Sequence, residues 1–154
     1  MRNITKSMKA KLFFLFKMAA VSVLVCGCSS ESDDIEKKRV RLSYVAVKGA
    51  DTAVLKLVVT GSQFKGQYEV NYHSSFKDSG DVKGVIKGDT LLGDYNFQHY
   101  GMEKWDRVPI TFLKRDGKLI LGAGTVETYF SKSYFKAGTQ VDYSDPKFVF
   151  LKID

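Results

Sequence analysis

The chain has 154 residues, and its 24 basic and 17 acidic residues give a formal net charge of +7. Five of the basic residues precede Cys28 and no acidic residue does, so the segment after Cys28 carries 19 basic and 17 acidic residues, a net charge of +2. This balance gives no reason to expect nucleic-acid binding. Both cysteines lie at positions 26 and 28, which excludes a disulfide, a thiol nucleophile or a thiolate metal site from the rest of the chain.

Residues 1–27 have the pattern of a secretory signal peptide. A basic leader precedes Met18–Gly27, an apolar run of about ten residues, whereas a bilayer-spanning helix needs about 20. Extending the run back to Leu12 would lengthen it but would place Lys17 inside it, which argues against a membrane-spanning helix. A retained membrane helix is the alternative to a cleaved signal peptide. The basic residues of the leader are Arg2, Lys6, Lys9, Lys11 and Lys17.

The sequence Val25-Cys26-Gly27-Cys28 resembles the lipobox of bacterial lipoproteins. The resemblance implies that the cysteine after the small residue, Cys28 rather than Cys26, receives lipid and becomes the mature N-terminus. Two or more acyl chains would anchor the protein lastingly in a membrane. The alternative is cleavage by an ordinary signal peptidase and release as a soluble protein.

Residues 28–38 are polar apart from Ile35 and are predicted to be a flexible tether behind the lipid. The acidic residues Glu31, Asp33 and Asp34 resemble the surface-export signal of lipoproteins in Bacteroidota. Ser29, rather than aspartate, follows Cys28, which favours the outer membrane over the inner one. We therefore expect an outer-membrane lipoprotein, on the periplasmic face or on the cell surface.

Residues 39–154 are enough for one domain with a single core, and they lack a sustained helical period. Apolar and polar residues alternate instead, and glycine-containing turns recur at short spacing. We expect Ser74–Asp81 to be a polar loop and 128–145 to hold at most one short strand. The predicted strands are 39–47, 53–60, 63–73, 82–87, 90–99, 105–114, 118–126 and 148–153.

The turns predict how these strands connect. Gly88-Asp89 and Asp116-Gly117 are two-residue links typical of tight hairpins. Consecutive antiparallel strands with short turns favour an all-β, up-and-down meander that closes into a barrel of about eight strands, because closure removes exposed edges. Such a barrel is filled by its own side chains or holds one small ligand.

The run Gly84–Phe97, with Phe112 and Lys118–Gly124 after it, is similar to small uncharacterised Bacteroidota lipoproteins with a lipocalin-like barrel. The resemblance covers about half of the chain after Cys28. It implies a fold and a location, but no activity. Copper-responsive envelope lipoproteins are a more distant likeness, and their cysteine pair is absent from this domain, so metal sensing is not carried over.

The two histidines are the first candidates for metal or acid–base chemistry. His73 alternates in phase with Glu69, and His99 in phase with Tyr95. His73 should therefore face solvent and His99 the interior, which argues against a shared metal site. For His99 we favour a ring satisfied by a backbone partner. We expect no metal and no cofactor.

The loop 100–107 is the densest polar and aromatic cluster of the chain. Trp105 and Arg107, together with His99 and Tyr95, could line the barrel mouth and bind a ligand by stacking and charge. The favoured alternative is an ordinary hairpin loop with the Trp105 side chain as a plug. In 128–145 the aromatic residues could form a lid or a docking patch, although a core lining is favoured. These residues are Tyr129, Phe130, Tyr134, Phe135 and Tyr143.

No catalytic constellation emerges from the sequence. The carboxylates offer no spacing that selects an acid–base pair, a nucleophile elbow is absent, and the glycines belong to strands and turns rather than to a phosphate loop. We therefore predict a non-enzymatic, lipid-anchored envelope protein that binds a small apolar or amphipathic ligand. The alternative is an interaction lipoprotein that docks a membrane partner through an aromatic surface. The carboxylates considered are Glu69, Asp94, Glu103, Asp106 and Glu127.

Overall fold

The computed structural model describes residues 38–130 and 132–153. The predicted signal peptide, Cys28 and the tether up to residue 37 lie outside the described residues. The described part is built of strands, and no helix in it could cross a bilayer. The strands are β1 (Arg39–Lys48), β2 (Asp51–Thr60), β3 (Gln63–Tyr72), β4 (Phe76–Lys87), β5 (Thr90–His99), β6 (Trp105–Arg115), β7 (Lys118–Leu121), β8 (Val126–Tyr129), β9 (Lys132–Phe135) and β10 (Val149–Ile153).

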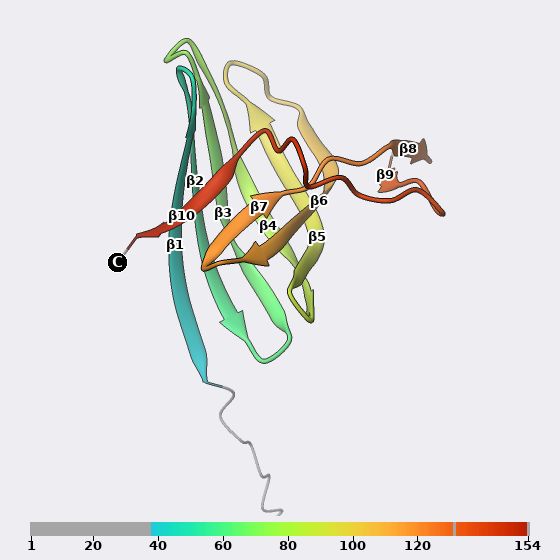
Figure 1. Ribbon diagram of the computed structural model, residues 1–154. Helices are drawn as coiled ribbons and strands as arrows, with labels where there is room; N and C mark the ends of the chain where they lie inside the picture. Colours follow the sequence, from blue (N-terminus) through green and yellow to red (C-terminus); the bar gives the residue numbers. More distant parts are fainter. Residues whose placement is uncertain (1–37, 131, 154) are drawn as a thin grey trace, which may run out of the picture. The chain divides into compact units, whose positions relative to one another are not determined.

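Eight of these strands form a closed antiparallel barrel in the order β1-β10-β7-β6-β5-β4-β3-β2 (Figure 1). Strands β1 to β7 follow one another around the barrel, each paired with the strand that comes next in the chain. Strand β10 returns to close the ring between β7 and β1. The predicted all-β meander and its closure are confirmed.

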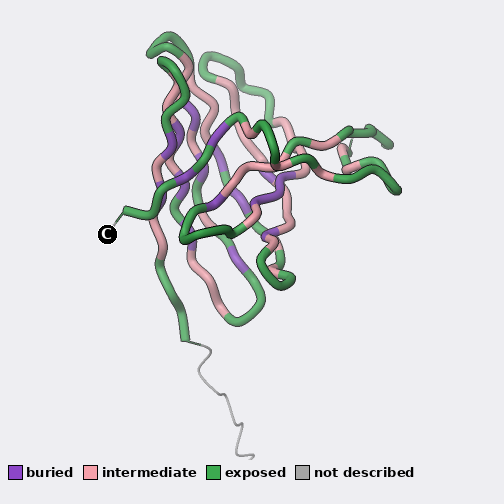
Figure 2. The backbone as a smooth tube through the Cα atoms, in the orientation of Figure 1, coloured by how far each residue is buried: buried purple, intermediate pink, exposed green. Residues whose placement is uncertain are grey.

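The core follows from the alternation of the strands, since every second side chain points inward. Aromatic side chains meet at the centre: the rings of Phe112 and Phe150 lie 5.7 Å apart, and Tyr68 lies 6.3 and 5.9 Å from them. Phe112 and Phe150 are fully buried, which stabilises the fold by about 2–3 kcal/mol each. The buried residues lie on the barrel strands, apart from Phe148, which directly precedes β10 (Figure 2).

The predicted hairpin turns are present. Asp116 and Gly117 have φ angles of 52° and 74° between β6 and β7, the left-handed pair that a tight two-residue hairpin requires. Gly88 has φ 58° between β4 and β5. Asparagine, aspartate and glycine tolerate positive φ angles best, which is why these dipeptides predict a hairpin turn.

The predicted polar loop at 74–81 is wrong, because β4 begins at Phe76 and pairs with β3 over this stretch. Its polar residues, such as Lys77 and Asp81, occupy the outer row. The inner row holds Asp78 and Gly80, whose small or polar side chains do not signal a core-facing strand. The stretch is nevertheless half-buried, and Gly80 is buried.

Gly84 and Gly93 face each other across β4 and β5, where the two backbones approach closely. A Cβ on Gly84 would lie 2.0 Å from the carbonyl oxygen of Leu92, and one on Gly93 would lie 2.2 Å from that of Lys83. Only glycine fits such a close approach within a strand. These two residues therefore allow β4 and β5 to approach closely at this point of the barrel wall.

The chain leaves the barrel after Leu121, so β7 is much shorter than the predicted 118–126. Gly122 permits the departure, since a Cβ there would lie 2.5 Å from Val141 and 2.6 Å from Tyr143. The segment that follows covers part of the outer face of β6, and Thr111, an outward residue, is fully buried beneath it. This segment contains two short strands, β8 and β9, where at most one was predicted (Figure 1).

The closure between β1, β10 and β7 is short. Strand β1 pairs with β2 along its whole length, but with β10 only from Ser43 to Val45. Strand β10 meets β7 only at Val149 and Phe150. We call these two contacts the seam of the barrel.

Candidate functional site

The four residues predicted to form a ligand site at the barrel mouth do not share a face. Tyr95 and His99 lie in the inner row of β5, as their phase predicted. Trp105 and Arg107 lie in the outer row of β6, where Arg107 is the register partner of the outward Asn96. The structure therefore does not bring all four side chains together as one site, although His99 and Trp105 line the same shallow depression beside Tyr100.

Tyr95 belongs to the core of the barrel. Its ring is stacked on Phe97 at 4.6 Å with an interplanar angle of 9°, and its hydroxyl donates a hydrogen bond of 3.1 Å to the carbonyl oxygen of Tyr68. Burial raises the pKa of Tyr95 well above its ordinary value, with smaller contributions from neighbouring tyrosines and carboxylates. These contacts make Tyr95 a packing residue.

His99 forms the chemically richest cluster among the described residues, at the end of the barrel where β3, β4 and β5 meet. Its Nδ1 lies 2.5 Å from Oδ1 of Asp78, and the hydroxyl of Tyr72 donates a 3.0 Å hydrogen bond to the other oxygen of the same carboxylate. The Asp78 side chain is only 13% exposed and that of His99 is 37% exposed. The expected backbone partner of His99 is therefore replaced by a carboxylate.

Two further side chains complete the His99–Asp78–Tyr72 cluster. Lys147 Nζ lies 4.5 Å from the centre of the Tyr72 ring, and the Phe76 ring lies 5.1 Å from that of His99. Burial raises the pKa of Tyr72, and the nearby Asp78 carboxylate raises it further. These hydrogen bonds fix the ends of β3, β4 and β5 together. Sequence reasoning missed Asp78 because it placed this residue in a loop.

Histidine does not form a metal centre in the described part of the chain. His73 lies in the turn after β3, with a side chain that is 74% exposed and paired with Asp51 at 3.1 Å. The described residues contain no group of three or more histidine, cysteine, aspartate or glutamate side chains placed to hold a metal ion. The two histidines thus use separate carboxylate partners.

The loop cluster before and within β6 is held by surface ion pairs. Arg107 Nη2 donates a 2.7 Å hydrogen bond to Oδ2 of Asp94, and this bond raises the pKa of Arg107. Lys104 lies 2.7 Å from Asp106. Trp105 is 50% exposed, so the favoured interpretation of its side chain as a plug is wrong.

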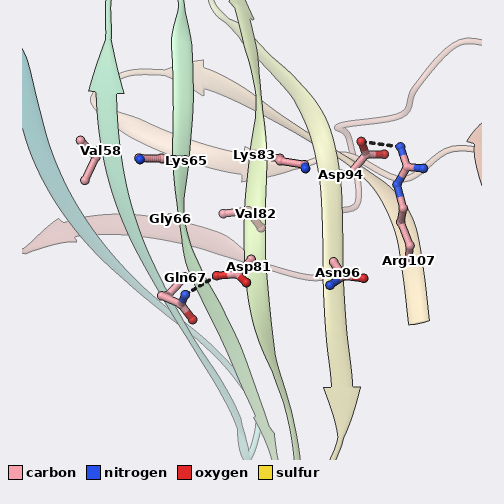
Figure 3. A pocket seen from close by; sticks show the side chains of 10 residues that line it. All are labelled: Val58, Lys65, Gly66, Gln67, Asp81, Val82, Lys83, Asp94, Asn96 and Arg107. Carbon is pink, nitrogen blue, oxygen red and sulfur yellow. Dashed lines mark hydrogen bonds and ion pairs between the residues drawn. The ribbon is translucent and has the colours of Figure 1, made fainter. Parts of the chain in front are cut away.

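A broad depression lies on the outer face of the barrel, over β2 to β6. It has a volume of about 780 Å³, and Figure 3 shows its polar side chains in cross-strand rows. One row contains Lys65 and Lys83 as direct register partners, and the next contains Gln67 and Asp81, which are hydrogen bonded to each other. A second depression of about 680 Å³ shares both lysines and extends to Arg39. Sequence analysis did not single out any of these cations.

The aromatic residues of the segment after β7 divide into two groups. Tyr129, Phe130 and Tyr134 are 70%, 83% and 47% exposed, so the favoured core lining is wrong for them. Phe135 and Tyr143 are half-buried, and the Tyr143 hydroxyl lies 2.8 Å from Oγ1 of Thr111. The second group therefore attaches the segment to the barrel. Tyr134 interacts with Arg107 of β6, while Tyr129 and Phe130 remain open to solvent.

We define the aromatic hairpin as β8 and β9 together with Phe130, which follows β8. The two strands form their own two-stranded sheet, and β9 contacts β6. Tyr129 and Phe130 lie at its tip, with ring centres 4.4 Å apart. Lys136 pairs with Glu127 at 3.1 Å across the hairpin. Within the described residues, the other edge of β8 has no strand partner.

No protein-family model, no curated protein and no solved structure matches the chain.

Proposed function

We propose that the protein is a lipid-anchored envelope protein, held in the outer membrane by lipid on Cys28, which docks a membrane partner protein through the aromatic hairpin. The observation that carries this proposal is the exposure of Tyr129 and Phe130, at 70% and 83%, on adjacent positions of a hairpin tip. The role is non-enzymatic. Exposed apolar clusters on a soluble surface commonly mark interaction sites.

The free energy of the tip favours a role in binding. Covering an exposed aromatic side chain yields about 1.5–3 kcal/mol, and aromatic anchors dominate the energy of many protein interfaces. Phe130 also has a φ angle of 47°, a left-handed backbone conformation that bulky residues rarely adopt. The chain thus holds an exposed aromatic residue in a costly conformation, which is a feature often found at functional sites.

The open edge of β8 favours a protein partner over a bilayer. Its outward N–H and C=O groups could pair with a strand of a partner, as in β-augmentation. Hydrocarbon would leave the same groups unsatisfied at a cost of several kcal/mol each. Glu127, which is exposed on β8, would add a further cost in hydrocarbon. The hairpin therefore suits a partner with an apolar pocket beside a strand edge.

A ligand inside the barrel receives less support. The centre is occupied by Tyr68, Phe112 and Phe150 in mutual edge contacts, and the stacked ring of Tyr95 extends this packing. A filled interior is one of the two usual states of an eight-stranded barrel. The outward-facing aromatic residues are thus a better basis for function than the inward-facing ones.

The experiment is in-cell crosslinking of the full chain, with a photo-reactive residue at Thr128. We expect one reproducible crosslinked partner, and the double variant Tyr129→Ala, Phe130→Ala should reduce its yield at least tenfold. Tyr100→Ala is the matched control, because Tyr100 is 71% exposed but lies in another loop. An unchanged yield in the double variant would overturn the proposal.

A second arm tests the bilayer as the occupant. The Cys28→Ala chain, which cannot be lipidated at that position, is mixed with vesicles of phosphatidylethanolamine and phosphatidylglycerol. We expect no sedimentation with the vesicles. Sedimentation that depends on Phe130 would show that the hairpin enters lipid, and the partner-protein proposal would then be abandoned.

A further inference from the structure

The outer face of β2 to β5 carries a concentration of unpaired positive charge. Arg39, Lys65 and Lys83 line the same depression of about 680 Å³. All three residues are exposed, and none of them has an ion pair or hydrogen bond through its side chain among the described residues. Asp94 is the one acidic residue of this lining, and its carboxylate is already paired with Arg107 at 2.7 Å.

The placement of the two lysines opposes the stability of the sheet. Lys65 and Lys83 are direct cross-strand partners of β3 and β4, and like charges in this position are destabilising. In Figure 3 their side chains point away from each other. Lys83 also has Asp94 as its partner on β5, yet this carboxylate pairs with Arg107 instead. An anionic group bound by both lysines, once their long side chains turn toward it, would neutralise this like-charge pair.

The surface beside the lysines is apolar. One step along the same face, Val85 and Leu92 are direct partners of β4 and β5, and both line the depression. Val85 is 40% exposed. Val58 on β2 lies at the other side of the lysines and also lines the depression. Positive and apolar surface thus adjoin each other within one concave area.

We propose that this outer-face depression binds an anionic amphiphile, a molecule with a phosphate or carboxylate head and an apolar chain. The head lies across Lys65 and Lys83 with Arg39 at the end of the depression, and the chain lies over Val85 and Leu92. This site is separate from the aromatic hairpin and does not depend on the docking proposal.

The test is isothermal titration calorimetry of the full chain with octyl phosphate, with octyl glucoside and inorganic phosphate as comparison probes. We expect octyl phosphate to bind, octyl glucoside not to bind, and inorganic phosphate to bind at least tenfold more weakly, because it lacks the apolar chain. Binding should weaken as salt concentration rises. If octyl glucoside binds as tightly as octyl phosphate, the proposed role of the lysines is wrong. If inorganic phosphate binds as tightly as octyl phosphate, the proposed role of the apolar surface is wrong.

Variants locate the site. Lys65→Gln and Lys83→Gln should each raise the dissociation constant of octyl phosphate about tenfold, the effect of losing one charge-assisted hydrogen bond. Lys114→Gln is the control, because Lys114 is exposed but lies outside both depressions. Thermal unfolding confirms that each variant is folded. The proposal is refuted if Lys65→Gln and Lys83→Gln bind octyl phosphate with the same dissociation constant as the control.

Discussion

Replacing Asp78 with alanine tests whether the His99–Asp78–Tyr72 cluster holds the barrel end together. The change leaves the Tyr72 hydroxyl and the His99 ring without their shared acceptor. A hydrogen bond to a charged group contributes about 1.5–3 kcal/mol. Two such bonds at the lower end would contribute about 3 kcal/mol together, and the partial exposure of His99 reduces this sum. We expect the free energy of unfolding to fall by about 2–3 kcal/mol, which corresponds to a decrease in Tm of roughly 10 °C.

The assay is urea unfolding followed by circular dichroism, for the wild type, Asp78→Ala, His99→Ala and the double variant. The coupling free energy between the two positions should be about 1 kcal/mol, as expected for two residues in direct contact. Glu103→Ala is the control, because Glu103 is exposed in the loop before β6, and this surface substitution should change stability by less than about 0.5 kcal/mol.

Two results would refute this reasoning. An Asp78→Ala variant as stable as the control would mean that the cluster does not support the fold. Strictly additive effects of Asp78→Ala and His99→Ala would mean that the short contact between them contributes nothing. Either result would leave this cluster without a structural explanation, and a role in proton transfer would become the better hypothesis.

Two further predictions follow from the structure and one from the sequence. Burial raises the pKa values of Tyr68, Tyr72 and Tyr95, so their contribution to stability is complete below pH 10 and is lost as the pH rises further. In an absorbance titration these three tyrosines should ionise only at the pH at which circular dichroism shows the protein to unfold. Gly84→Ala should lower the free energy of unfolding by about 3 kcal/mol in urea, because its Cβ would meet the Leu92 carbonyl, whereas Gly101→Ala, with an open surrounding, should cost about 1 kcal/mol. Cys28→Ala should abolish metabolic labelling with palmitate, and Cys26→Ala should leave it intact.

The sequence was a good guide to strands with alternating patterns and to turns with φ-specific residues. Alternation identified β1, β2 and β3 nearly to their ends, and Asp116-Gly117 located a hairpin. Both signals depend only on residues that are neighbours in the sequence, so they can be recognised without knowing which strands pair. Closure of the barrel could be inferred because eight strands with short connections leave few other ways to pair their edges.

The site was harder to predict because it depends on partners across strands. The phase of β5 placed His99 inward correctly, but no local pattern revealed that Asp78 of β4 is its register partner. Continuing the alternation back from Val82 through Gly80 would have placed Asp78 in the inner row. Trp105 and Arg107 were grouped with His99 by proximity in sequence, and the alternation of β6 puts them on the opposite face.

The cations Lys65 and Lys83 were overlooked for a different reason. Each one alone is an ordinary outward residue of an amphipathic strand, and only the register between β3 and β4 makes them a pair. The aromatic residues at the hairpin tip were misjudged because apolar character usually indicates burial. Their exposure is set by the departure of the chain from the barrel after Leu121, which depends on close packing at Gly122.

The seam has a consequence for how the barrel forms and opens. Strands β1 to β6 are joined by neighbouring hairpins, whereas the pairing of Ser43 with Ile153 joins the two ends of the domain and carries the largest loop-closure entropy. The curved sheet should therefore assemble first and the seam should shut last. In the native state the seam should also open locally more often than the rest of the barrel. Amide protons of β10 should therefore exchange with solvent sooner than those of β3 and β4.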